Sequence, residues 1–147
     1  MNEIFRNPSL QLISFTITEK GYALYDSKGN YFGFVKNDIE NGPKKPTSTM
    51  AIITSMLFER FKAGKYPLAI VSMDNVSQNG KKLETSVFEI AERWLEKGYV
   101  NNDFIDYIKN DKIITFPWTM IDKITPRPRE DIAESLEKLG IENMKIL

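Results

Sequence analysis

Two residue types are missing from this chain of 147 residues: it has no cysteine and no histidine. The lack of cysteine excludes disulfides, thiolate metal sites and cysteine nucleophiles. The lack of histidine excludes a Ser-His-Asp triad, histidine-ligated zinc and histidine acid–base chemistry. Any chemistry in this chain must therefore use Lys, Asp, Glu, Tyr, Ser, Thr, Asn or backbone groups, and we expect no metal site.

Net charge and long apolar runs are lacking too. Lys plus Arg and Asp plus Glu balance at 20 each, so the composition gives no sign of a nucleic-acid groove. No apolar run approaches the roughly 18–20 residues that cross a bilayer, and no signal-peptide pattern follows the first residues. These absences predict a cytoplasmic protein with no nucleic-acid or membrane partner. The 41% of residues that are hydrophobic suffice for the core of one domain.

Apolar patterning predicts alternating strands and helices. Short apolar segments at about 10–17, 68–73 and 112–116 predict three core strands, and we expect the first two to be buried on both faces. A strand–helix–strand order favours an α/β fold with a largely parallel sheet flanked by helices. The predicted helices are about 48–62 with Thr47 as its N-cap, about 81–97, a short one after 101–103, and about 128–139.

Two further features concern the loops. Residues 22–35 carry aromatic side chains on both sides of the turn-like stretch 26–30, which predicts a β-hairpin excursion. Polar turns follow each predicted strand, at 16–22, 72–80 and 116–126. Because parallel α/β sheets bind ligands at the carboxyl ends of their strands, these three turns are the candidate site.

The three turns resemble the signature segments of the long-chain mannitol dehydrogenase family. That family includes mannitol dehydrogenases, fructuronate reductases (D-mannonate oxidoreductases) and tagaturonate reductases. Its segments have the forms T-x-T-E-x-G-Y, S-C-D-N-x-x-x-N-G and F-P-N-[ST]-M-[VI]-D-[RK]-I-T-P. Met73 replaces the Cys and Trp118 replaces the Asn. The matching residues are Thr16, Thr18, Glu19, Gly21 and Tyr22 in the first, Ser72, Asp74, Asn75, Asn79 and Gly80 in the second, and Phe116, Pro117 and 119–126 in the third.

The resemblance implies a partial Rossmann-like fold: residues 1–147 would form one domain, the C-terminal portion of an NAD-binding domain. The family's Gly-rich phosphate turn, G-x-G-x-x-G, occurs nowhere in the sequence. The family's catalytic lysine, with its Asn and His, lies in a helical C-terminal domain. We therefore expect both of those units to be absent, NAD binding to be impaired, and this chain alone to hold no catalytic residue and to be inactive.

Roles for single residues follow from the resemblance. It places Thr16, Thr18, Glu19, Asn75, Asn79, Ile121 and Asp122 at the coenzyme, and Trp118 and Lys123 on the substrate side. Asn75 or Asn79 would also contact the substrate oxygen, because an amide donates a hydrogen bond without titrating. Simpler interpretations remain open. In these, the Asp and Asn residues are turn and helix-cap residues and Trp118 is a packing residue. Glu19 with Lys20, and Asp122 with Lys123, are then surface ion pairs.

The function implied is that of an NAD-dependent oxidoreductase acting on CH–OH groups (EC 1.1.1 type). It would interconvert a keto-sugar acid or ketose and its aldonate or polyol, of the fructuronate/mannonate type; Trp118 favours the sugar-acid branch. The substrate would be a small sugar acid or polyol. The alternative is a non-catalytic α/β domain that contacts a protein or self-associates through exposed sheet edges. The missing Gly-rich turn argues against an unrelated nucleotide-binding module.

Overall fold

The computed structural model describes residues 2–122 and 130–141, so the predicted site residue Lys123 lies outside the described residues. The described chain contains three strands, six α-helices and two 3-10 helices. Their order is α1 (Asn2–Arg6), β1 (Leu12–Phe15), η1 (Glu19–Tyr22), α2 (Gly33–Asn41), η2 (Gly42–Lys44), α3 (Thr49–Gly64), β2 (Leu68–Ser72), α4 (Asn79–Glu96), α5 (Asn102–Lys109), β3 (Ile114–Thr115) and α6 (Glu130–Lys138).

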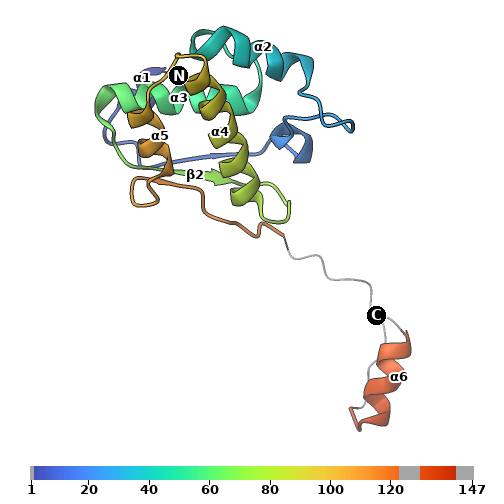
Figure 1. The fold of residues 1–147 in the computed structure, drawn as a ribbon. Helices are drawn as coiled ribbons and strands as arrows, with labels where there is room; N and C mark the ends of the chain where they lie inside the picture. Colours follow the sequence, from blue (N-terminus) through green and yellow to red (C-terminus); the bar gives the residue numbers. More distant parts are fainter. Residues whose placement is uncertain (1, 123–129, 142–147) are drawn as a thin grey trace.

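The sheet is parallel, as the sequence predicts, with the strand order β1-β2-β3. Leu12 pairs with Ala69 and Leu68 pairs with Ile114, so the three strands run in register to the same edge. The helices α3, α4 and α5 lie together over the sheet (Figure 1). All three polar turns therefore leave the sheet at one edge.

The prediction that β1 is buried on both faces is wrong, whereas β2 is buried along nearly its whole length. Leu12 and Ser14 are exposed, while Ile13 and Phe15 pack against the core. The cause is position: within the described residues β1 is an edge strand that pairs only with β2. An apolar run does not distinguish an edge strand from a central one.

The long helices bury the faces that their spacing predicts. On α4, Leu83, Val87, Ile90 and Trp94 are fully buried. The indole N–H of Trp94 donates to the backbone oxygen of Asp38 at 3.0 Å, so the largest core side chain also satisfies its polar atom.

The N-cap of α3 is Ser48 and not Thr47. The Ser48 hydroxyl accepts from the backbone N–H of Ala51. Thr47 is engaged elsewhere, because its N–H and hydroxyl both donate to the buried carboxylate of Asp38, at 2.8 and 2.9 Å. Ser48 N–H donates to the same carboxylate at 2.7 Å, which places a negative charge at the helix N-terminus.

The predicted hairpin over 22–35 is reduced to a turn closed by one antiparallel bridge, between Tyr25 and Tyr31. Asp26 closes that turn by accepting from the N–H groups of residues 28 and 30. The Tyr31 hydroxyl then binds Glu89 on α4, so the segment packs on a helix instead of extending as strands. Residues 33–35 begin α2, a helix that the sequence reasoning missed together with α1.

A buried arginine ties the N-terminal segment to the beginning of two strands. Arg60 on α3 is fully buried and has no carboxylate among its hydrogen-bond partners. Burial lowers the pKa of its guanidinium. Its partners are five backbone oxygens, those of Phe5, Asn7, Leu10, Tyr66 and Pro67, at 2.6 to 3.0 Å. The guanidinium thereby fixes where β1 and β2 start.

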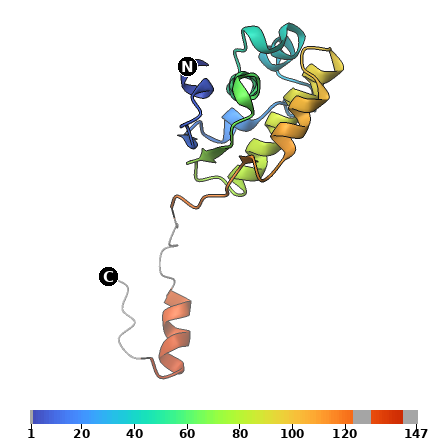
Figure 2. The same ribbon diagram turned by 90° about the vertical axis from the view of Figure 1, so that its left-hand side faces the viewer.

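The helix α6 stands apart from the other elements in both ribbon views (Figures 1 and 2). Its predicted apolar face is not a core face, since Ile132 is 51% exposed and Leu139, just beyond its end, is 78% exposed. Across the described ranges, no helix has the length and apolarity needed to cross a bilayer.

Candidate functional site

The three polar turns meet at the carboxyl edge of the sheet and are bonded to one another. Asp74, after β2, accepts from backbone N–H groups of the first turn. Asn79, at the start of α4, binds Thr119 in the third turn. The turns thus lie together as the strand order predicts, and that they form a ligand site stays a prediction.

Asp74 is the anchor of the first turn. Its carboxylate accepts from Ile17 N–H at 3.0 and 3.1 Å and from Thr18 N–H at 2.9 Å. The Tyr22 hydroxyl donates to the same carboxylate at 2.5 Å. Burial on its own raises the pKa of Asp74, but these hydrogen bonds outweigh it and hold the pKa below its ordinary value. Asp74 is therefore an anion at neutral pH with its lone pairs used inside the protein.

Tyr22 completes this cluster from η1. Because its one proton goes to Asp74, the hydroxyl of Ser72, 2.5 Å away, donates to the phenol oxygen. Burial, and next the bond to Asp74, raise the pKa of Tyr22 to about 12. The Ser86 hydroxyl on α4 donates to the backbone oxygen of Tyr22 at 2.8 Å, which fixes η1 against the helix.

Asn79 is fully buried, and its amide is used entirely by the protein. The side-chain nitrogen donates to the backbone oxygen of Asp74 at 3.0 Å and to the hydroxyl of Thr119 at 2.7 Å. The side-chain oxygen accepts from the N–H groups of Gly80 and Thr119 at 2.7 and 3.1 Å. This amide has no donor left for a coenzyme or substrate, so the geometry gives Asn79 a connecting role in place of the expected contact.

Two motif glycines are required by close approach. A Cβ on Gly80 would lie 2.4 Å from the backbone oxygen of Phe116 and 2.7 Å from that of Pro117. A Cβ on Gly21 would lie 2.9 Å from the side chain of Ile17. Both distances are shorter than real Cβ contacts, so only glycine lets α4 and η1 pack against the turns.

Several other motif side chains are exposed at the same edge. Thr16, Thr18, Glu19 and Asn75 are exposed in the first two turns, as are Ile121 and Asp122 in the third. Trp118 is 63% exposed and is not a core residue. Glu19 pairs with Lys82, at 3.3 Å, and not with its neighbour Lys20. Sequence reasoning did not single out Met73 and Met120 as exposed members of the candidate site, although they are 40% and 82% exposed. Each is an apolar residue inside a polar turn, and that pattern was the signal that could have identified them.

The N-termini of α3 and α4, the helices before and after β2, are partly occupied by groups of the protein itself. At α4, the backbone oxygens of Phe116 and Pro117 crowd against Gly80 and the Asn79 side chain caps the Gly80 N–H. At α3, the Ser48 hydroxyl caps the Ala51 N–H, and the Asp38 carboxylate accepts from Ser48 N–H just before the helix. The close third turn and the nearby carboxylate disfavour a pyrophosphate, the ligand that such termini hold in dinucleotide-binding folds.

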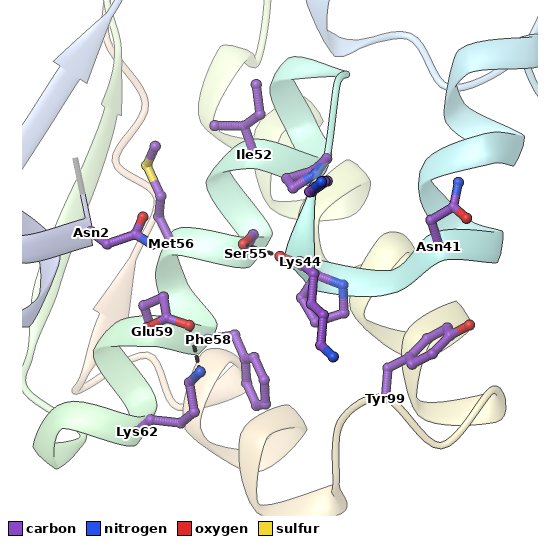
Figure 3. A pocket seen from close by; sticks show the side chains of 13 residues that line it. Asn2, Asn41, Lys44, Ile52, Ser55, Met56, Phe58, Glu59, Lys62 and Tyr99 are labelled. Atoms are coloured by element: carbon purple, nitrogen blue, oxygen red, sulfur yellow. Dashed lines mark hydrogen bonds and ion pairs between the residues drawn. The ribbon is translucent and has the colours of Figure 1, made fainter.

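A separate cavity of about 750 Å³ lies in the helical layer (Figure 3). It is lined by residues of α1, the 41–46 loop and α3, with Tyr99 on another side, and no residue of the three turns contributes to it. Among the described residues, no group of three or more His, Cys, Asp or Glu is placed to hold a metal ion. The cavity and the three turns are therefore separate places on the molecule.

Comparison with known proteins agrees with this geometry. Residues 2–144 match the family model that describes the mannitol dehydrogenase Rossmann domain. The chain belongs to the mannitol dehydrogenase family. Its three-stranded parallel sheet is thus part of a Rossmann-type fold, and the fold class expected from the sequence is confirmed.

Several relatives in this family are oxidoreductases. D-mannonate oxidoreductase of Thermotoga maritima is 56% identical over 144 residues, which are 98% of this chain and 26% of that protein. A mannitol dehydrogenase of Saccharomyces cerevisiae is 33% identical over 128 residues, 85% of this chain and 24% of that protein. The crystal structure of a D-sorbitol dehydrogenase in substrate-free form superposes with a TM-score of 0.65 at 26% identity, covering 97% of this chain and 28% of that one. The chain therefore spans about a quarter of the length of these relatives.

Proposed function

We propose that this chain forms the nicotinamide-facing part of an NAD-dependent oxidoreductase that interconverts a keto-sugar acid and its aldonate. The observation that carries the proposal is the division of the motif residues. Asp74, Asn79 and Tyr22 are buried and hold the turns together. Other polar members stand exposed at one sheet edge, namely Thr16, Thr18, Glu19, Asn75 and Asp122. Fixed turns that present small polar side chains at this edge are suited to hold a ligand.

The exposed residues fit one half of the coenzyme. Hydroxyl and amide groups at Thr16, Thr18 and Asn75 match ribose hydroxyls and a carboxamide, and the exposed side chain of Ile121 offers an apolar surface for a ring. The pyrophosphate half is not matched, because the third turn crowds the N-terminus of α4 and the Asp38 carboxylate lies at the N-terminus of α3. We therefore propose that the nicotinamide riboside portion binds here and that NAD binding to this chain alone is weak.

The chemistry assigned to single residues is limited to binding and orientation. When bound, the coenzyme supplies or accepts the hydride. The Asn75 amide donates a hydrogen bond to the substrate oxygen, where negative charge grows during reduction. Thr16, Thr18, Glu19 and Asp122 position the coenzyme. We place Trp118 on the substrate side with the predicted Lys123, and we assign no proton-transferring residue to this chain.

The substrate class rests on two supports. The relative that is 56% identical is a D-mannonate oxidoreductase, and Trp118 stands where the mannitol branch has Asn. A fructuronate/mannonate pair is therefore the proposed substrate, with a ketose and its polyol as the second candidate because a mannitol dehydrogenase is 33% identical. A cytoplasmic location stays a prediction from the sequence.

Two half-coenzymes of matched charge test the proposal. Reduced nicotinamide mononucleotide and AMP each carry one ribose and one phosphate, so a difference between them reports the base. In amide NMR titrations we expect the nicotinamide compound to shift residues 16–19, 73–75 and 118–122, with a Kd on the order of millimolar. AMP should shift none of them. Equal shifts with both compounds, or none with the nicotinamide compound, would contradict the proposal.

Asn75 and Asn79 give a matched pair of variants. Asn75→Ala should leave the unfolding free energy within about 0.5 kcal/mol of wild type, because the side chain is exposed, and weaken the nicotinamide compound about fivefold or more. Asn79→Ala should instead cost about 2–4 kcal/mol, since it leaves buried backbone groups unpaired. Ser77→Ala, an exposed change in the same turn, is the control for both.

Self-association remains the second candidate, and one observation favours it. Within the described chain β1 is bonded on one side only, and Leu12 is 53% exposed. An open apolar edge of this kind can pair with a second copy. Light scattering across a concentration series should then show dimers that Leu12→Lys abolishes. A clean monomer at millimolar concentration removes this candidate.

A further inference from the structure

Thr18 holds a backbone conformation that is costly for a side chain. Its φ is 62° and its ψ is 166°, a region that essentially only glycine visits. Lys65 and Gln78, the other described non-glycine residues with positive φ, have ψ values of 35° and 40° and so sit in the milder left-handed helical region. A β-branched residue at Thr18 is therefore the most strained position in the described backbone.

Asp74 is the group that imposes this conformation. Its carboxylate binds the Thr18 N–H at 2.9 Å and the preceding N–H of Ile17 at 3.0 and 3.1 Å. On the other side the Thr18 oxygen accepts from Gly21 N–H at 3.0 Å, which starts η1. Tyr22 in turn holds the carboxylate. The peptide groups on both sides of Thr18 are thus fixed by partners, which is the condition under which strain persists.

The Thr18 side chain does nothing for the fold that explains the cost. It is exposed, it does not cap η1, and it makes no hydrogen bond to the described residues. Glycine would adopt the same backbone conformation without strain. A threonine held here against its preference points to a group outside the fold that its hydroxyl and methyl contact.

We propose that Asp74 is a positioning residue, which holds Thr18 in its strained conformation and so presents the segment 16–19 to the coenzyme. This inference rests on the proposed function. The carboxylate itself does not touch the ligand: it is 7% exposed and its partners are internal. The strain thereby serves ligand orientation and not stability, and separate measurements of stability and of ligand binding distinguish these two effects.

Stability variants test the strain without any ligand. Thr18→Ala removes the hydroxyl and keeps a Cβ, whereas Thr18→Gly removes the Cβ and with it the strain. After allowance for the extra freedom of glycine in the unfolded chain, the folding equilibrium constant of Thr18→Gly should be about twofold to thirtyfold larger than that of Thr18→Ala. In an Asp74→Ala background, which leaves no side-chain acceptor for the N–H groups of Ile17 and Thr18, this gain should fall below about twofold because the clamp is gone. If Thr18→Gly is no more stable than Thr18→Ala, the strain and the proposal are overturned, even where Asp74→Ala fails to fold.

Ligand binding separates positioning from a purely structural role. We expect the more stable Thr18→Gly to bind reduced nicotinamide mononucleotide about fivefold or more weakly than wild type, because the segment loses its fixed direction. Thr18→Ala should show a smaller loss. Equal affinity of Thr18→Gly and wild type overturns the positioning role while leaving the proposed function intact. If wild type itself fails to bind, the proposed function and the presenting role both fall, and only the structural clamp remains.

Discussion

Substitution of Gly80 by alanine is a direct test of how the third turn meets α4. The new Cβ would lie 2.4 Å from the backbone oxygen of Phe116, whereas ordinary van der Waals contact for a Cβ is 3.4–4 Å. The turn cannot retreat freely, because Thr119 is bonded to Asn79 at 2.7 and 3.1 Å and also to the backbone oxygen of Ser72. We therefore expect the clash to break hydrogen bonds and not merely to shift a loop.

The magnitude follows from three contributions. Overpacking costs about 1–3 kcal/mol, and losing two of the turn's hydrogen bonds costs about 2 kcal/mol more. Alanine recovers up to about 1 kcal/mol of helix propensity. Gly80→Ala should thus lower the unfolding free energy by about 2–4 kcal/mol, and its urea midpoint by about 1–2 M.

Gly33 provides the matched control for this change. It also begins a helix, its φ is not positive, and a Cβ there would meet nothing within 4 Å. Gly33→Ala should stabilise the protein by about 0.5–1 kcal/mol. Urea unfolding followed by circular dichroism measures both variants under one condition. The reasoning is refuted if Gly80→Ala is as stable as wild type, or if both substitutions act in the same direction.

Two further predictions concern the buried charges. Arg60→Met should lower the unfolding free energy by more than about 3 kcal/mol, because five backbone oxygens lose their donor, whereas Arg6→Met, which removes an exposed ion pair, should cost less than about 1 kcal/mol in the same urea assay. Because the pKa of Asp74 is lowered, its stabilisation is present above its unfolded pKa, near 3.8, and is lost as pH falls through the folded value. Because the pKa of Tyr22 is raised from 10.0 to about 12, its stabilisation is complete below pH 10 and is lost as pH rises towards 12. Urea titrations at stepped pH should show the unfolding free energy falling at both the acid and the alkaline end. Asp74→Asn should flatten the acid fall and Tyr22→Phe the alkaline one, and an unchanged pH dependence would contradict these assignments.

The motif residues of this family member divide into two groups with different physical roles. Buried members such as Asp74, Asn79 and Gly80 hold three loops in contact, so substituting them lowers the free energy of unfolding. Exposed members such as Asn75 and Trp118 contribute little to the fold. The same short signature therefore contains a buried scaffold and an exposed surface, for which we propose ligand binding, and mutational data on it are interpretable only when the two are separated.

The sequence by itself determined the α/β class, the two long helices and the meeting of the three polar turns at one edge of the sheet. Periodic apolar spacing is a local property, and the parallel order of strands places their carboxyl ends at one edge. It did not determine that β1 is an edge strand, that residues 33–41 form a helix, or that Asn79 is buried while Asn75 is exposed. Those outcomes depend on contacts between distant residues: Asn79 meets Thr119 across 40 positions, and Asp74 meets Thr18 across 56. Two asparagines four residues apart are chemically identical in the sequence, and only the packing of the third turn against α4 buries Asn79 in a structural role and leaves Asn75 exposed.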